Sequence, residues 1–335
     1  MSNQIKAVTL NDSSPLHIKL IEFFLNNKAL IILLVICIAS TFASPFFLTS
    51  RNLINIARQV AASAVIGIGF TVIIASGNLD LSVGFMVGTL GVIMGLLSQT
   101  AMPFGVVLLI GAAVGAGFGL FNAMWGVVFG LPLFIVTLAS GEIFRGMTFL
   151  LSGAAPVINL NPAFRELGQG HIGPIPIPII IMFVVLIVVY FLLNKTIFGR
   201  QAIAAGGNRD AARIAGINVK KITVLVYMLM GVCASIAAMI ITGRAASAQP
   251  IAGSGMAMDA IAAVVIGGTP LTGGSGKVVG TLIGCLLVGV INNVLNLANV
   301  DASWQMAAKG MMILVAIFLD VISSNFFNAR LRKQA

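Results

Sequence analysis

The stretch ALIILLVICIASTFASPFFLTS, residues 29–50, lies between Lys28 and Arg51 and contains no charged side chain. A helix needs about 20 predominantly apolar residues to cross the hydrocarbon core of a bilayer, which is roughly 30 Å thick. Residues 59–79, 222–243 and 278–300 are similar uncharged runs. The sequence therefore predicts an integral membrane protein with several spanning helices.

The composition of the whole chain agrees with this prediction. Of the 335 residues, 59% are hydrophobic and 8% are charged, whereas about 25% are charged in ordinary soluble domains. The 37 glycines favour close helix packing, because small residues let membrane helices approach one another. Segments of about 10 alternating residues, typical of membrane β-barrels, are absent from the sequence. We expect an all-α, tightly packed bundle.

Several functional classes are disfavoured by the residues that are scarce. The three cysteines lie in apolar runs, where a thiol acts as a small hydrophobic group, and with two histidines there is no zinc-ligand spacing. The net charge of +10 forms no basic patch with aromatic residues of the kind that binds nucleic acid. The sequence shows neither paired acids nor a nucleophile with a base, so it does not indicate an integral membrane enzyme.

Apolar runs separated by charges, prolines and glycines predict about ten transmembrane helices. The long uncharged run 81–141 is divided at Pro103 and Pro132, because proline interrupts a helix. The predicted spans are residues 29–47, 60–76, 82–98, 104–127, 131–152, 175–193, 222–242, 252–268, 278–297 and 304–323.

These spans define three regions of the chain. Residues 1–28 are predicted to be a cytoplasmic segment with an amphipathic helix at 17–25. Residues 29–323 form the membrane domain, and 324–335 form a cytoplasmic basic tail. A cleaved signal peptide is the alternative for the first span, but its apolar core would be about 7–15 residues long, which is shorter than this run.

The distribution of Lys and Arg predicts the orientation. An even number of spans places both termini on the same side, and a cytoplasmic placement puts the basic residues of both tails and of residues 194–221 inside. The basic residues then left outside are Arg51, Arg58, Arg165 and Arg244. This bias follows the positive-inside rule.

Two stretches of the chain resemble each other. TVIIASGNLDLSVGFMVGTL, residues 71–90, aligns with AVVIGGTPLTGGSGKVVGTL, residues 263–282, and both end in VGTL. Each reads as a helix, a glycine-containing break and a second helix. Interrupted helices at matching places in two halves indicate a transport pathway. The similarity has two explanations, a possible internal repeat and the convergence of two glycine-rich hairpins. In the predicted topology both stretches run in the same direction.

The second stretch also resembles a phosphate-binding loop. The motif G-x-x-x-x-G-K-[ST] places backbone N–H groups, a lysine and a hydroxyl around phosphate and magnesium. Gly276-Lys277 is preceded by Leu271 where the first glycine would stand and is followed by Val278. The motif fails at both ends, so we expect no ATPase site in this chain.

Residues 194–221 form the largest internal hydrophilic segment. Asn208 is a good helix N-cap, Asp210 lies in the first turn, and Gly216 can end the helix. A short capped helix is thus expected outside the bilayer, with an apolar surface made by Ala211, Ala212, Ile214 and Ala215. This helix either touches lipid headgroups or inserts into a cytoplasmic partner.

Four stretches carry a family resemblance. They are SGNLDLSVG (76–84), GRQAIAAGGNRDAARIAGINVKKI (199–222), SAQPIAGSGMAMDAIAAVVIGGTPLTGGSGKVVGTLIG (247–284) and NNVLNL (292–297). Together they resemble the ribose-type monosaccharide permeases of bacterial ABC importers, and the resemblance covers nearly all of residues 20–322.

The resemblance implies a transport subunit of the bacterial inner membrane that is not itself an enzyme. Expected partners are a second copy of the permease, a cytoplasmic ABC ATPase subunit that uses ATP and Mg, and a periplasmic sugar-binding protein. No cofactor or metal is expected on this chain. The residues implied to couple it to the ATPase are Gly206, Gly207, Asn208, Arg209, Asp210, Ala211, Ala212, Arg213 and Ile214.

Polar residues within the predicted spans are candidates for a substrate pathway or gate. They are Asn78, Asp80, Ser82, Asn292, Asn293 and Asn296. Family members commonly carry Gly-Ile-Asp-Leu-Ser where this chain has Gly-Asn-Leu-Asp-Leu-Ser at 77–82, and the added amide of Asn78 either alters substrate choice or caps the next helix. Asp80 either caps a helix at residue 81 or holds a gate. The asparagines around 292 either bind a sugar or hold helices together.

A second function stays open at this point. A self-sufficient, ion-coupled transporter would use an intramembrane acid such as Asp80 or Asp259 as its proton site, because ionisable residues in spans are functional candidates. Asp259 could instead hydrogen-bond a neighbouring helix, and Lys309 could reach the membrane surface from its span end.

Overall fold

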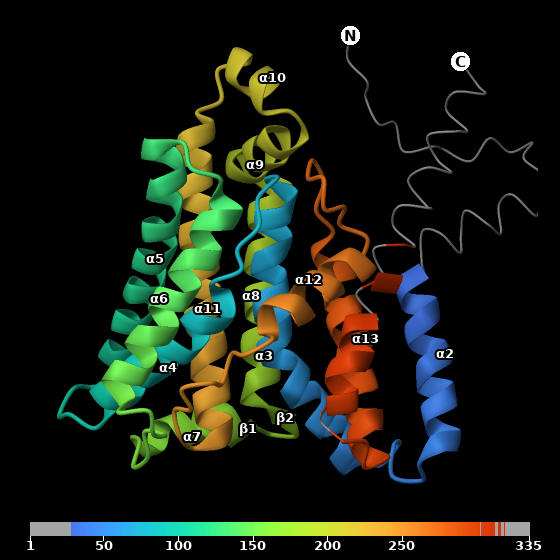
Figure 1. The fold of residues 1–335 in the computed structure, drawn as a ribbon. Helices are drawn as coiled ribbons and strands as arrows, with labels where there is room; N and C mark the ends of the chain where they lie inside the picture. The colour runs from blue at the N-terminus through green and yellow to red at the C-terminus, as the bar shows by residue number, and fades with distance from the viewer. Residues whose placement is uncertain (1–27, 302, 312–313, 316–317, 319–335) are drawn as a thin grey trace, which may run out of the picture.

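The computed structural model describes residues 28–301, 303–311, 314–315 and 318. Six helices in this part are long and apolar enough to cross a membrane. They are α3 (Ser50–Ala75), α5 (Phe104–Phe129), α6 (Leu133–Ser152), α8 (Ile177–Lys195), α11 (Val219–Ala245) and α13 (Val278–Leu297). Three shorter apolar helices accompany them: α2 (Lys28–Ala43), α4 (Val83–Ser98) and α12 (Met256–Ile266). The bundle in Figure 1 is thus helical and multi-pass.

The predicted span boundaries fall close to these helices. Pro103 and Pro132 directly precede α5 and α6, where proline is tolerated because the first N–H groups of a helix have no partner. Gly130 ends α5 with a φ of +72°. The largest difference is α3, which begins at Ser50 instead of residue 60 because Thr49 caps it.

The ends of the chain limit the test of the ten-helix prediction. Residues 303–311 are helical where the tenth span is predicted, and the rest of that span lies mostly outside the described residues. The predicted amphipathic helix at 17–25 and the tail 324–335 lie outside them too. Ten spans therefore stays a prediction.

The centre of the bundle is formed by α3 and α11. Helix α3 is buried along most of its length and packs against α8, α11, α12 and α13, while α11 packs against α3, α4 and α5. Gly115 and Gly231 allow α5 and α11 to approach, because a Cβ on either would collide with the other's backbone. Close packing through small residues is therefore observed, as predicted.

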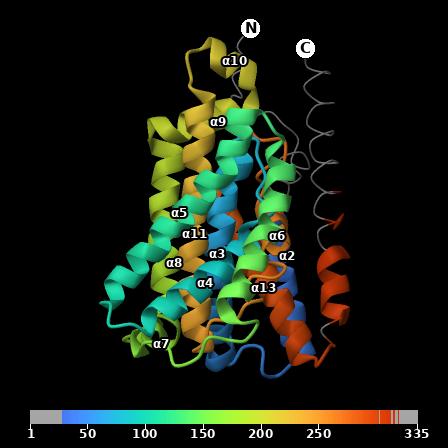
Figure 2. The ribbon, with the colours of Figure 1, turned by 60° about the vertical axis from the view of Figure 1, so that its left-hand side comes forward.

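One end of the bundle carries short elements between α6 and α8. They are α7 (Pro162–Gln169), β1 (His171–Ile172) and β2 (Ile175–Pro176), with β1 and β2 paired antiparallel. Helix α7 was not among the predicted elements, although Asn161 caps it and Pro162 occupies its first turn. Figure 2 shows α7 at this end, away from α10.

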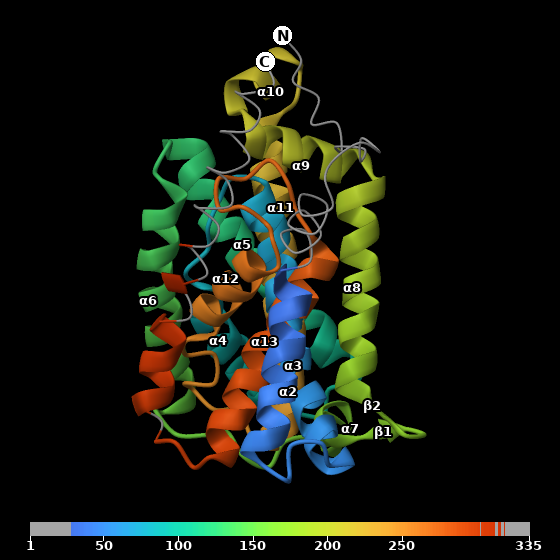
Figure 3. The ribbon, with the colours of Figure 1, turned by 90° about the vertical axis from the view of Figure 1, so that its right-hand side faces the viewer.

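The opposite end carries α9 (Ile197–Gly207) and α10 (Arg209–Ile214), which project beyond the spanning helices in Figures 1 and 2. Only one helix was expected in residues 194–221. The second arises because Thr196 accepts a hydrogen bond from the backbone N–H of Gly199 and so caps α9. Figure 3 shows α6 and the helical residues 303–311 on one side of the bundle.

The two similar stretches both form a helix, a break and a helix. The first break, residues 76–82, joins α3 to α4, and the second break, residues 267–277, joins α12 to α13. Gly77 and Gly268 have φ values of +71° and +87°, a left-handed conformation that favours glycine. Helix α4 packs mainly on α6 and α11, whereas α12 packs along α13.

Candidate functional site

Helix α10 is built by the caps that the sequence predicts. The side-chain oxygen of Asn208 accepts from the backbone N–H groups of Asp210 and Ala211, at 3.0 and 2.9 Å. Asp210 lies in the first turn and Arg213 in the last turn, which suits the helix dipole. Gly216, with a φ of +80°, follows the helix end. The predicted short, capped helix is confirmed.

The predicted apolar surface of α10 divides into two parts. Ala212 is buried with Ala205 and Val219, so this side fastens α10 to its own chain. Ile214 points the other way and is 89% exposed. Asp210 and Arg213 form an ion pair at 3.7 Å with exposed side chains. Helix α10 therefore presents one isolated apolar side chain next to charged groups.

The first break contains three of the predicted pathway or gate residues. Oδ1 of Asp80 accepts from the backbone N–H of Ser82 at 2.9 Å and from its hydroxyl at 2.6 Å. Helix α4 begins at Val83, so Asp80 does not cap a helix at residue 81. It folds the residues that precede the helix. Its other oxygen, Oδ2, is buried and lacks a hydrogen-bond partner among the described residues.

Three spanning helices hold this break in place. Asn122 of α5 donates to the hydroxyl of Ser82 at 2.8 Å, and Thr137 of α6 accepts from the backbone N–H of Leu81 at 3.1 Å. Tyr227 of α11 donates to the carbonyl of Leu79 at 2.7 Å. Sequence reasoning missed these residues, although polar side chains within apolar runs were a signal that could have found them.

Asn78 links the first break to α10. Its amide nitrogen donates to the carbonyl and the hydroxyl of Ser76, at 3.1 and 2.9 Å. Its side-chain oxygen accepts from the guanidinium of Arg209 at 2.6 Å. The idea that Asn78 caps the next helix is wrong, because that helix begins five residues later and both ends of the amide are used elsewhere. The structure thus joins a predicted gate residue to a predicted coupling residue.

Below α10, three backbones meet with glycines at the contact. We call this the glycine junction, and it consists of Ala75, Gly77, Gly206, Gly207, Gly273 and Gly274. The backbone N–H of Gly274 donates to the carbonyl of Ala75 at 3.0 Å. A Cβ on Gly206 would collide with that carbonyl oxygen, and a Cβ on Gly273 would lie 2.9 Å from the Cα of Gly77. The two breaks and α9 are therefore in direct backbone contact.

The three predicted asparagines of α13 have different surroundings in the structure. Asn293 exchanges two side-chain hydrogen bonds with Asn52 of α3, at 2.9 and 2.8 Å, so this pair holds two helices together. Asn296 is exposed and accepts from Gln305 at 3.0 Å. Asn292 is buried, and its Oδ1 lacks a partner among the described residues.

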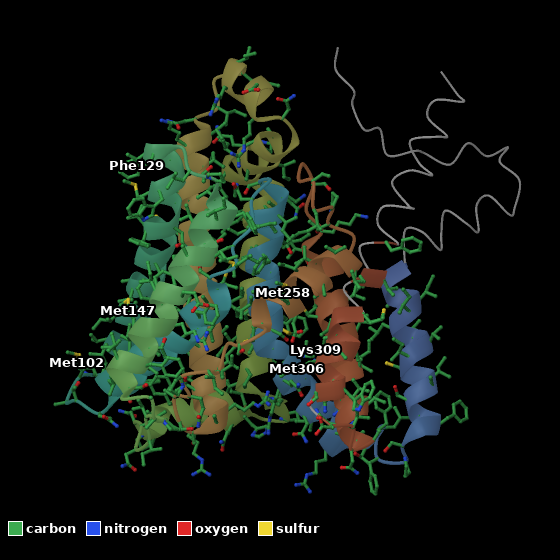
Figure 4. All side chains as sticks on the ribbon, in the orientation of Figure 1. Met102, Phe129, Met147, Met258, Met306 and Lys309 are labelled. Atoms are coloured by element: carbon green, nitrogen blue, oxygen red, sulfur yellow. The ribbon has the colours of Figure 1, made fainter. Side chains whose placement is uncertain are left out.

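Asn292 lines a cavity of about 400 Å³, which we call the chamber. Its walls come from α3, α11, α12, α13 and the helical residues 303–311. Within it, Lys309 donates to Oδ2 of Asp259 at 2.8 Å. The prediction that Lys309 reaches the membrane surface is wrong, because this pair holds it against α12. Figure 4 shows Lys309 in the half of the bundle farther from α10.

Comparison with known proteins completes the description of the site. Residues 52–317 match the family model described as branched-chain amino acid transport system / permease component. The chain is 40% identical to the ribose import permease protein RbsC of Escherichia coli strain K12, over 89% of this chain and 94% of that protein. It is 39% identical to RbsC of Bacillus subtilis, over 86% and 90%.

A third relative is named after another sugar, D-allose. The chain is 34% identical to the D-allose transport system permease protein AlsC of Escherichia coli strain K12, over 88% of this chain and 90% of that protein. No solved structure matches the chain.

Proposed function

This chain belongs to the branched-chain amino acid transport system permease family, and we propose that it is the membrane subunit of an ATP-driven importer for ribose or a related monosaccharide. The relatives that share about 40% of its residues over most of its length are named as ribose import permeases. ATP hydrolysis, with Mg, takes place in a separate cytoplasmic ATPase subunit, and a periplasmic binding protein delivers the sugar. The chain alternates between a cavity open to the outside and one open to the inside.

The observation that carries this proposal is the bond between Arg209 and Asn78. Helix α10 projects beyond the bundle with Ile214 exposed, which suits docking into a partner. Arg209 on that helix bonds the break between α3 and α4. A partner that moves α10 would therefore move the break, where Asp80 and Ser82 form the proposed inner gate.

The distribution of charge supports a cytoplasmic position for α10. The α10 end of the bundle carries the basic residues of the α8–α11 connection and Lys277 of the second break. The α7 end carries Arg51, Arg165 and Arg244. By the positive-inside rule, we infer that the α10 end faces the cytoplasm, and we propose the same side for both termini.

A second copy of the permease is the proposed neighbour of α6. Glu142 and Arg145 form an ion pair at 3.5 Å in the middle of this helix, with side chains 62% and 53% exposed. Charged side chains in spanning helices rarely face lipid. Cover by a protein partner or by an aqueous path between two copies would explain the pair.

The proposal is tested by purifying the tagged chain from its native host in mild detergent and identifying co-purifying proteins by mass spectrometry. The Ile214→Asn variant should lose the ATPase subunit, because it removes the exposed apolar side chain of α10. The matched control is Ile197→Asn, which changes an isoleucine that is also exposed, at the start of α9. Glycine variants at residue 206 are unsuitable here, because they disturb the glycine junction.

Two results would count against the proposal. If the wild-type chain co-purified with no ATPase in several mild detergents and transported solute alone with a proton gradient, it would be an ion-coupled transporter. If Ile214→Asn retained the ATPase as well as Ile197→Asn did, coupling through α10 would be wrong.

A further inference from the structure

The chamber has a mixed polar and apolar lining. Its apolar side chains include Ile240, Met256 and Val288. The polar lining consists of Gln59, Ser63, Arg244, Asp259, Asn292 and Lys309. Small-molecule sites have this character, with a mostly apolar wall, a few convergent polar groups and a volume of about 300–1,000 Å³.

Asn292 is the observation that points to a ligand. The residue is 8% exposed, and its Oδ1 lacks a hydrogen-bond partner among the described residues. A buried acceptor without a donor is unfavourable, because no hydrogen bond offsets its loss of contact with water. The neighbouring Asn293 fills both ends of its amide through Asn52. Packing of helices therefore explains Asn293 and does not explain Asn292.

The ion pair of Asp259 and Lys309 adds a second reason. Their side chains are 18% and 31% exposed, so both charges are largely removed from water. Such pairs contribute little net stability, because desolvation offsets their attraction. Both residues line the chamber, so they can form further hydrogen bonds there. The carboxylate can accept further bonds and the ammonium can donate them.

The chemistry of the lining suits a polyhydroxylated ligand without a positive charge. Each sugar hydroxyl donates one hydrogen bond and accepts two, which matches a wall that offers carboxylate, ammonium, guanidinium and amide groups together. Asp259 and Lys309 neutralise each other, and Arg244 adds a positive charge to the lining, so a cationic solute would find no matching charge. The apolar side chains suit the C–H faces of a sugar ring.

We propose that the chamber binds one neutral monosaccharide, with Asn292 accepting a hydrogen bond from a hydroxyl and the Asp259–Lys309 pair binding others. This inference rests on the proposed function and adds the residues and the half of the bundle where the sugar binds. The chamber lies away from α10, so a sugar there occupies the outer half of the pathway.

Cys285 is a natural reporter for this site. It lines the chamber, whereas Cys233 does not. The full-length chain with Cys37→Ala and Cys233→Ala would be purified with its accompanying subunits and treated with methyl methanethiosulfonate. Labelling of Cys285 would be followed by intact mass spectrometry with and without D-ribose or D-allose. The matched control carries Cys37→Ala and Cys285→Ala and reports on Cys233.

At a sugar concentration ten times the dissociation constant, labelling of Cys285 should slow about tenfold, because only the unoccupied fraction reacts. Labelling of Cys233 should not change. Asn292→Leu should remove the protection while leaving the rate without sugar as it is. If Cys285 does not react, Ser63→Cys supplies a reporter on the α3 wall.

Several outcomes would overturn the inference. One is that the sugar slows labelling of Cys233 as much as that of Cys285, and another is that Cys285 stays protected in Asn292→Leu. A third is that ribose 5-phosphate protects Cys285 while neither neutral sugar does. A fourth is that Cys285 is not protected in a preparation that imports the sugar. Failure of the proposed function would be seen separately, as absent ATP-dependent uptake of ribose and allose in proteoliposomes that contain all co-purified subunits.

Discussion

The first break, residues 76–82, and the second break, residues 267–277, start in the same way and are held differently. Each follows a helix whose end is closed by a glycine with positive φ, Gly77 or Gly268. In both, the next backbone N–H bonds back into the helix, from Asn78 to Ile73 and from Thr269 to Val264, each at 3.1 Å. Similar sequence therefore produced the same local ending.

Beyond these glycines the two breaks differ. The first is held by side chains from α5, α6, α10 and α11, which include Asn122, Tyr227 and Arg209. The second is held by local bonds and by the glycine junction. The backbone N–H of Lys277 donates to the hydroxyl of Thr269 at 2.9 Å, and that of Gly273 donates to the carbonyl of Pro270 at 3.1 Å. The first break is therefore bonded to side chains of four helices, whereas the second is held by its own residues and by backbone contacts at the glycine junction.

The largest effect is expected where both breaks meet α9. Gly206→Ala places a Cβ against the backbone of residues 75–77, and overpacking of this kind typically destabilises by about 1–3 kcal/mol. Thermal unfolding of the purified protein should shift down by several degrees. Gly207→Ala is the matched control, because its Cβ would meet only Gly274 Cα at 3.7 Å, an ordinary contact. Equal stability of the two variants would show that the junction is not tightly packed.

The next effect, on function and not on folding, is expected at the first break. Arg209→Gln and Asn78→Ile each remove the bond to α10, and hydrogen bonds to charged groups contribute about 1.5–3 kcal/mol. Sugar transported per ATP hydrolysed should fall about tenfold or more, since 1.4 kcal/mol corresponds to tenfold. The measurement is parallel uptake and phosphate release in proteoliposomes.

The double variant makes this test specific. If the two residues act through one bond, combining the changes should be no worse than either alone, and additive losses would contradict the link. Arg200→Gln removes an exposed arginine of α9 at the same end and is the control for loss of charge.

The smallest effect is expected at the second break. Thr269→Val removes the acceptor for the N–H of Lys277, and a typical hydrogen bond contributes about 0.5–1.5 kcal/mol. The unfolding midpoint should fall slightly, with transport per ATP unchanged. Thr272→Val, at an exposed position of the same break, should change neither. A loss of coupling in Thr269→Val would show that the second break also transmits motion.

The sequence predicts local features of this molecule well. Uncharged runs located the apolar helices, and Asn208, Asp210 and Gly216 marked the ends of α10, because caps depend on neighbouring residues. Features that join distant parts of the chain were missed. Nothing near Asn78 in the sequence indicates Arg209 as its partner, and the pairing of Asp259 with Lys309 depends on how α12 and residues 303–311 pack.

The same reason explains the divided asparagine group. Asn292, Asn293 and Asn296 are close along one helix, and the sequence could not show that Asn52 satisfies one of them and that Gln305 bonds another. Helix α7 was missed because eight residues are too few for a clear apolar period.

The glycine junction also has a mechanical consequence. Where the side chains of two elements interdigitate, the ridges on one element sit in the grooves of the other. The elements slide past each other only if these side chains separate first. At this contact the glycines of three backbones remove those ridges. No glycine side chain stands between the backbones at this contact. A small slide or rotation of α9 against the two breaks therefore meets little steric resistance.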